Sequence, residues 1–136
     1  MKMDRRQLEK VSPFPLGQPN TAYAKYFIGD SYLSMLNSRE VAIANVTFAP
    51  GCRNNWHVHH GTGQILICVG GHGWYQEFGK PARRLQPGDV VYIPTEVKHW
   101  HGAAADEAFA HLALSVPGGT VDWLEPVSDG QYRQLG

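Results

Sequence analysis

From residue 23 onward, hydrophobic and polar positions form short segments that Gly and Pro separate. Apolar or alternating segments of about 4 to 8 residues are typical of β-strands. Outside the N-terminal 22 residues, no segment keeps a period of about 3.6 residues over three helical turns. The pattern therefore predicts nine strands, at residues 32–36, 41–48, 55–59, 64–69, 73–77, 83–85, 90–93, 99–102 and 109–116.

Turn-forming residues stand between these segments. Gly or Pro occurs at residues 49–51, 61–63, 70–71, 87–89 and 117–119. Such residues supply the fixed or positive φ that chain reversal requires. Short strands joined by such turns predict one all-β domain, an antiparallel sandwich or barrel, over residues 23–136. Residues 1–22 are expected to form an arm, because Pro13, Pro15 and Pro19 favour an extended strap.

Composition narrows the range of partners. The 136 residues include 12 Lys and Arg against 12 Asp and Glu, so the net charge is zero and a phosphate backbone is not an expected ligand. The longest apolar run, residues 65–69, is far shorter than the roughly 20 residues of a membrane span. The charged first ten residues do not resemble a secretory signal. We expect a cytoplasmic protein with free thiols at Cys52 and Cys68 and a small-molecule partner.

The histidines are clustered, because all seven lie between positions 57 and 111. Side chains two apart share a strand face, so His57 and His59 point the same way, as do His99 and His101. The strand that begins at Gln64 is expected to pair beside the strand of His57 and His59. Imidazoles that converge from neighbouring strands predict a site for manganese, iron, nickel, copper or zinc.

The spacing of these residues follows a known pattern. One segment has Gly51, His57, His59, Gln64 and Gly71 at fixed intervals, and a second has Gly88, Pro94 and His99. This spacing resembles the two-part motif of the cupin superfamily, with Gln64, Glu96 and Ala103 in place of the usual glutamate, glycine and asparagine. The resemblance implies a jelly-roll-like antiparallel barrel, the double-stranded β-helix. It also implies one divalent metal ion per chain, held by His57, His59, Gln64 and His99.

Three imidazoles and one amide carry no formal charge, so a divalent ion keeps its full charge toward a bound oxygen. This favours Lewis-acid chemistry over oxygen chemistry. Further segments, among them residues 56–59, 98–104 and 111–113, resemble small bacterial cupins related to the carboxymuconolactone decarboxylase-associated group, which includes manganese-dependent hydroxynitrile lyases. This second resemblance implies Mn²⁺, with Fe²⁺, Ni²⁺ or Zn²⁺ as alternatives.

In those lyases a histidine that matches His111 transfers the proton. With a pKa near neutrality, His111 is a candidate general base; the alternative is a core histidine bonded to a neighbouring strand. We expect the substrate pocket to include Asn54, Tyr92, His101 and Ser115. Asn54 stands where these lyases have threonine, and the loop between His59 and Gln64 is one residue longer than theirs.

Three functions follow as hypotheses. The first is a metal-dependent lyase that cleaves or forms cyanohydrins or related small hydroxy and carbonyl compounds. The second is an iron-dependent dioxygenase that acts on a small aromatic or enol, and the third is a barrel that binds a metal or a small molecule without catalysis. Edge strands that need cover, together with the N-terminal strap, predict a homodimer or a higher homo-oligomer.

Overall fold

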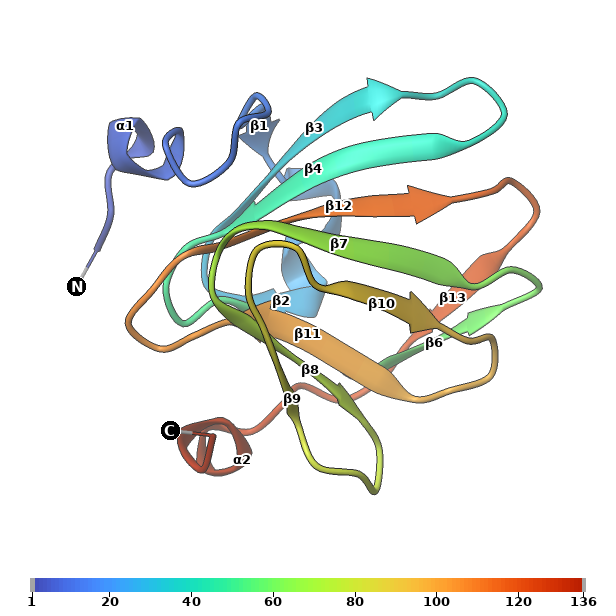
Figure 1. Ribbon diagram of the computed structural model, residues 1–136. Helices are drawn as coiled ribbons and strands as arrows, with labels where there is room; N and C mark the ends of the chain where they lie inside the picture. The colour runs from blue at the N-terminus through green and yellow to red at the C-terminus, as the bar shows by residue number, and fades with distance from the viewer. Residues whose placement is uncertain (1, 136) are drawn as a thin grey trace.

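The structure, a computed structural model, describes residues 2–135 as two antiparallel β-sheets that face each other (Figure 1). The first sheet has six strands, in the order β1 (Gln18–Pro19), β3 (Ser31–Asn37), β4 (Ala42–Phe48), β12 (Phe109–Ser115), β7 (Gln64–Gly71) and β10 (Val90–Ile93). The second has seven, β13 (Thr120–Trp123), β6 (His57–His60), β11 (His99–Ala103), β5 (Arg53–Asn54) and β2 (Phe27–Ile28), with β8 (Gly73–Glu77) between β11 and β9 (Arg83–Leu85). The predicted all-β barrel is confirmed.

The helices are short. They are α1 (Arg5–Leu8), the 3₁₀ helix η1 (Thr21–Tyr26) and α2 (Asp129–Arg133). A capping box begins both α-helices, with Asp4 and Gln7 at α1 and Ser128 and Gln131 at α2. Within residues 2–135, none of these helices has the length and hydropathy needed to cross a membrane.

All nine predicted strands are present, but one predicted pairing is wrong. Strand β6 pairs with β11 and β13, whereas β7 pairs with β12 and β10, so Gln64 does not lie beside His57 and His59 in one sheet. Residues 61–63 carry the chain from one sheet to the other and do not form a hairpin between neighbouring strands. Gln64 therefore approaches the histidines from the opposite sheet.

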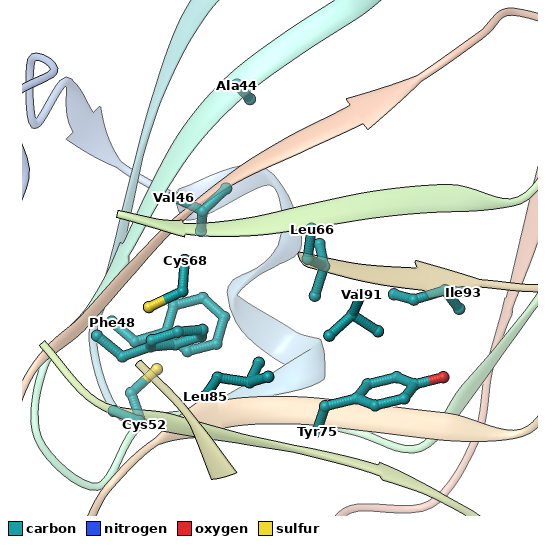
Figure 2. Packing of buried hydrophobic residues seen from close by; sticks show 12 residues of the cluster. Ala44, Val46, Phe48, Cys52, Leu66, Cys68, Tyr75, Leu85, Val91 and Ile93 are labelled. Atoms are coloured by element: carbon teal, nitrogen blue, oxygen red, sulfur yellow. The ribbon is translucent and has the colours of Figure 1, made fainter. Parts of the chain in front are cut away.

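The barrel interior is filled by the inward-facing positions of both sheets. Along β7, Leu66 and Cys68 are buried while Ile65 is exposed, as strand alternation requires. Figure 2 shows Leu66 and Cys68 in one apolar cluster with residues of the facing sheet, among them Tyr75. Phe48 belongs to this core and also lines an internal cavity, so the packed core forms part of the cavity wall.

The N-terminal arm covers one end of the first sheet. Leu8 and Leu16 are buried in a separate apolar cluster, and the Ser12 hydroxyl donates to Asn45 Oδ1 at 2.8 Å. Asn45 Nδ2 in turn donates to the carbonyl of Pro15 at 3.1 Å. These bonds satisfy polar groups that the arm would otherwise bury unpaired.

The C-terminal helix covers the outer side of the second sheet. Arg53, on β5, is 4% exposed and donates to the carbonyl of Val127 and to Asp129. Its guanidinium also lies 4.3 Å from the centre of the Tyr132 ring. These contacts fix β5, whose next residue, Asn54, faces the barrel interior.

Candidate metal centre

Strand pairing brings three histidines together. His57 on β6 lies directly opposite His99 on the neighbouring β11, and His59 is two residues further along the same face of β6. One ring nitrogen from each of the three lies within 4.8 Å of the other two. The predicted convergence of imidazoles from neighbouring strands is thus present in the structure.

Hydrogen bonds orient two of these rings. His57 Nδ1 lies 2.8 Å from the carbonyl of Asn55, and His99 Nδ1 lies 2.9 Å from that of Val97. A carbonyl only accepts, so both Nδ1 atoms carry the proton and both Nε2 atoms offer a lone pair. Within residues 2–135, the Nε2 atoms of His59 and His99 are buried without a hydrogen-bond partner. Unpaired nitrogens that face one another, with ring orientation fixed from behind, fit a bound divalent metal ion.

The environment also keeps these rings uncharged. Burial, followed by repulsion from His99, lowers the pKa of His57 well below its usual value. Burial lowers the pKa of His99 to about 4, and burial followed by His60 lowers that of His59. A metal binds only the neutral imidazole, so the low pKa values favour the ligand form at neutral pH.

A cavity of about 300 Å³ opens beside this cluster. Of the predicted site residues, the structure places Gln64, Asn54, His101, Ser115 and His111 in its wall, together with His57 and His59. Gln64 comes from β7, so the cavity joins the two sheets. These residues come from strands that are distant along the chain, and the sequence predicts each of them as a site residue.

Tyr92 does not line this cavity, contrary to expectation. It is 65% exposed and borders a separate depression next to Arg83 and Lys80. Along β10, Val91 and Ile93 point into the barrel, so alternation turns Tyr92 outward. Its pairing with Ile65, itself outward on β7, agrees with this orientation.

His111 is fully buried on β12, in the cavity wall. The centre of its ring lies 5.2 Å from the ring centre of Phe109, 5.6 Å from that of Phe48 and 4.9 Å from that of His101. Neither ring nitrogen has a partner at hydrogen-bond geometry within residues 2–135. The hydrogen bond to a neighbouring strand that the alternative of a core histidine requires is therefore absent from the described residues.

The expected near-neutral pKa of His111 is also wrong. Burial lowers this pKa to about 4, against a smaller opposing contribution from the backbone of Leu112. His111 is consequently a neutral imidazole at pH 7, with one nitrogen free to accept a proton.

His60 lies outside the cluster, as its position out of phase with His57 and His59 predicts. Its ring bridges two carboxylates, with Nδ1 2.6 Å from Glu96 and Nε2 2.8 Å from Asp122. Hydrogen bonds to Asp122 and then to Glu96 raise its pKa. Glu96 has a φ of 64°, in the left-handed region that favours glycine, and it stands where the cupin motif has glycine.

Sequence reasoning missed an aromatic wall of the cavity. Trp123 on β13 lies 4.6 Å from the ring of His57 and stacks on Tyr26 at the same distance. Tyr23 and Phe27 extend this wall from η1 and β2. The two- and four-residue strands and the 3₁₀ helix that carry these rings are too short for a periodic signal, although the density of aromatic residues at 23–27 was visible.

A two-sheet barrel that gathers three imidazoles from neighbouring strands is the architecture of a metal-binding cupin. The Cupin domain family matches residues 44–116, more than half of the chain, and the chain belongs to this family. It is 49% identical over 96 residues to a curated (R)-mandelonitrile lyase from Granulicella tundricola, covering 69% of this chain and 72% of that protein.

Solved structures agree with this assignment. A cupin-like protein from Thermotoga maritima superposes with a TM-score of 0.83 at 40% identity, over 91% of this chain and 96% of that one. A DMSP lyase from Ruegeria pomeroyi has a TM-score of 0.60 at 20% identity, over 95% of this chain and 63% of that one. The latter likeness concerns the fold alone.

Proposed function

We propose that this protein is a metal-dependent lyase that cleaves, and in reverse forms, small aromatic cyanohydrins. The observation that carries the proposal is His111, a buried neutral imidazole without a partner, in the wall of the same cavity as His57 and His59 of the cluster. A core rarely retains such a group unless a ligand uses it. The likeness to an (R)-mandelonitrile lyase supports the same reaction class.

The metal ligands in this proposal are His57, His59, His99 and Gln64. Each of the first three brings one ring nitrogen within 4.8 Å of the other two. Gln64 lines the cavity from the opposite sheet, and its amide oxygen is a suitable fourth donor. A bound divalent ion, which we propose to be Mn²⁺, would act as a Lewis acid toward the substrate oxygen.

His111 serves as the general base. In the cleavage direction, its free ring nitrogen accepts the hydroxyl proton of the cyanohydrin, and the oxygen electrons form the aldehyde C=O bond. The C–C bond to the nitrile breaks, and its electron pair leaves with cyanide. Transfer of the proton from His111 to cyanide gives hydrogen cyanide, so the base is regenerated.

The cavity suits an aromatic substrate with one polar end. Phe27, Phe48 and Trp123 contribute aromatic surface, while Asn54 and the histidines provide polar groups. An apolar wall with a few convergent polar groups is typical of small-molecule sites. An aryl group would pack against the aromatic side chains and leave the hydroxyl and nitrile near the imidazoles.

To test the proposal, manganese-loaded protein is mixed with mandelonitrile or with one of a panel of aromatic cyanohydrins. The release of aldehyde is measured by its absorbance. We expect turnover by the wild type and a loss of at least about 100-fold in His111→Gln, which keeps all proposed metal ligands. The matched control is His72→Gln, a histidine outside the cavity. No release by the wild type from any substrate contradicts the proposal, and substrate-dependent oxygen uptake by iron-loaded protein would favour the dioxygenase alternative.

A further inference from the structure

Asn54 makes two contacts with a single residue, His101. Its side-chain Oδ1 lies 2.9 Å from the backbone nitrogen of His101, and its Nδ2 lies 3.1 Å from ring Nε2. The backbone N–H is a donor in every protonation state, so the atom facing it must be the amide oxygen. The orientation of the Asn54 amide is therefore fixed by the backbone of β11.

This orientation decides where the proton of His101 lies. With the oxygen directed at the backbone, the NH₂ group faces the imidazole and has only hydrogens to offer. Nδ2 is nearer to Nε2 than to Nδ1, which is 3.5 Å away. The shorter distance favours Nε2 as the acceptor, and a neutral ring that accepts at Nε2 carries its proton on Nδ1.

Packing restricts rotation of the His101 ring. The His101 residue is 6% exposed, and its ring stacks on Phe48 with 10° between the planes. It meets the ring of His111 edge to face, at 90° and 4.9 Å. Both imidazoles line the cavity, so a bound molecule would meet one ring with a fixed tautomer beside one with two unpaired nitrogens.

We propose that Asn54 is a positioning residue that locks His101 in the Nδ1–H tautomer. His101 thereby becomes a hydrogen-bond donor to the substrate, and His111 remains the proton acceptor. The catalytic consequence rests on the proposed function, where the group that accepts from His101 is the nitrile of the cyanohydrin.

The tautomer can be observed directly by long-range ¹H–¹⁵N correlation NMR, with and without added Zn²⁺, which is diamagnetic. The His101 signals are assigned by their loss in His101→Gln. We expect a protonated Nδ1 and an unprotonated Nε2 in the wild type. Asn54→Asp places an acceptor oxygen against Nε2, so the proton should move there. Asn54→Ala has no side-chain hydrogen-bonding group to offer Nε2, so it should give a mixture of tautomers.

The matched control is Asn45→Asp, an equally buried asparagine in the opposite sheet, which should leave the His101 tautomer unchanged. A wild-type His101 with its proton on Nε2, or a tautomer indifferent to both Asn54 substitutions, would overturn the proposal. The effect of Asn54 on catalysis is measured in a separate assay. Asn54→Asp should lower kcat for cyanohydrin cleavage about 100-fold at unchanged metal content, as expected for one lost donor. A wild type that turns over no cyanohydrin defeats the proposed function while leaving the tautomer result intact.

Discussion

Replacing His111 by leucine should stabilise the protein while abolishing catalysis. His111 is fully buried, and both its ring nitrogens lack a hydrogen-bond partner within residues 2–135. Leucine has a similar volume and no polar atom, so it removes a group whose burial is unfavourable. A gain in stability at the cost of activity is the behaviour of a residue retained for its chemistry.

Two contributions set the size of this effect. An unsatisfied buried polar group costs about 1–3 kcal/mol, and this cost is present at every pH. The second contribution depends on pH, because burial lowers the pKa of His111 to about 4. The unfolded chain binds a proton near pH 6.5, so the wild type loses stability as the pH falls from there toward 4. At pH 5 this loss amounts to about 2 kcal/mol.

The assay is equilibrium urea unfolding at pH 7.5 and pH 5.0, followed by tryptophan fluorescence in the presence of a chelator. We expect His111→Leu to exceed the wild type by about 1–3 kcal/mol at pH 7.5 and by about 3–5 kcal/mol at pH 5.0. His111→Gln, which is polar but does not titrate, should show only the pH-dependent gain. A leucine variant less stable than the wild type at both pH values would refute this reasoning, because a satisfied core histidine behaves that way.

Three other predictions concern the surroundings of the site. The carboxylate partners of His60 raise its pKa, so the stability they contribute is fully present below about pH 6.5 and is lost as the pH rises through the pKa of the folded state. The urea midpoint of the wild type should therefore fall between pH 6 and 9, and His60→Gln should remove this fall. An unchanged fall in the variant would contradict the prediction. Trp123→Ala should raise KM for an aromatic cyanohydrin about tenfold at unchanged metal content, and an unchanged KM would place the aryl group elsewhere. Arg53→Ala leaves the carbonyl of Val127 without its donor and should cost about 1–3 kcal/mol in thermal or urea unfolding, whereas wild-type stability would show that this anchor is dispensable.

Strand positions could be predicted because they depend on local alternation. The period of two along β7 separates Leu66 from Ile65, and the same parity places His57 with His59 and His99 with His101. These relations need no knowledge of the partner strand. The histidine cluster was therefore accessible from the sequence once its spacing was compared with the cupin motif.

Pairing between strands could not be predicted in the same way. The short link at residues 61–63 looks like a hairpin turn, but the chain passes to the other sheet there, and only packing of the whole barrel decides this. Along β10 both alternating sets contain hydrophobic residues, Val90 with Tyr92 and Val91 with Ile93, so the sequence alone does not decide which set faces the core. The wall formed by Trp123 depends on β13, whose four residues pair with β6 through long-range contacts.

The most direct test of the central claim is the metal content per chain of protein purified without a histidine tag, measured by mass spectrometry. We expect about one divalent ion per chain in the wild type and in the control His72→Ala. We expect almost none in His57→Ala or His99→Ala, because each substitution removes one of three nitrogens that lie within 4.8 Å of one another. A wild type that refuses added manganese, iron and zinc, or variants that retain the ion, would contradict the assignment of these histidines as metal ligands.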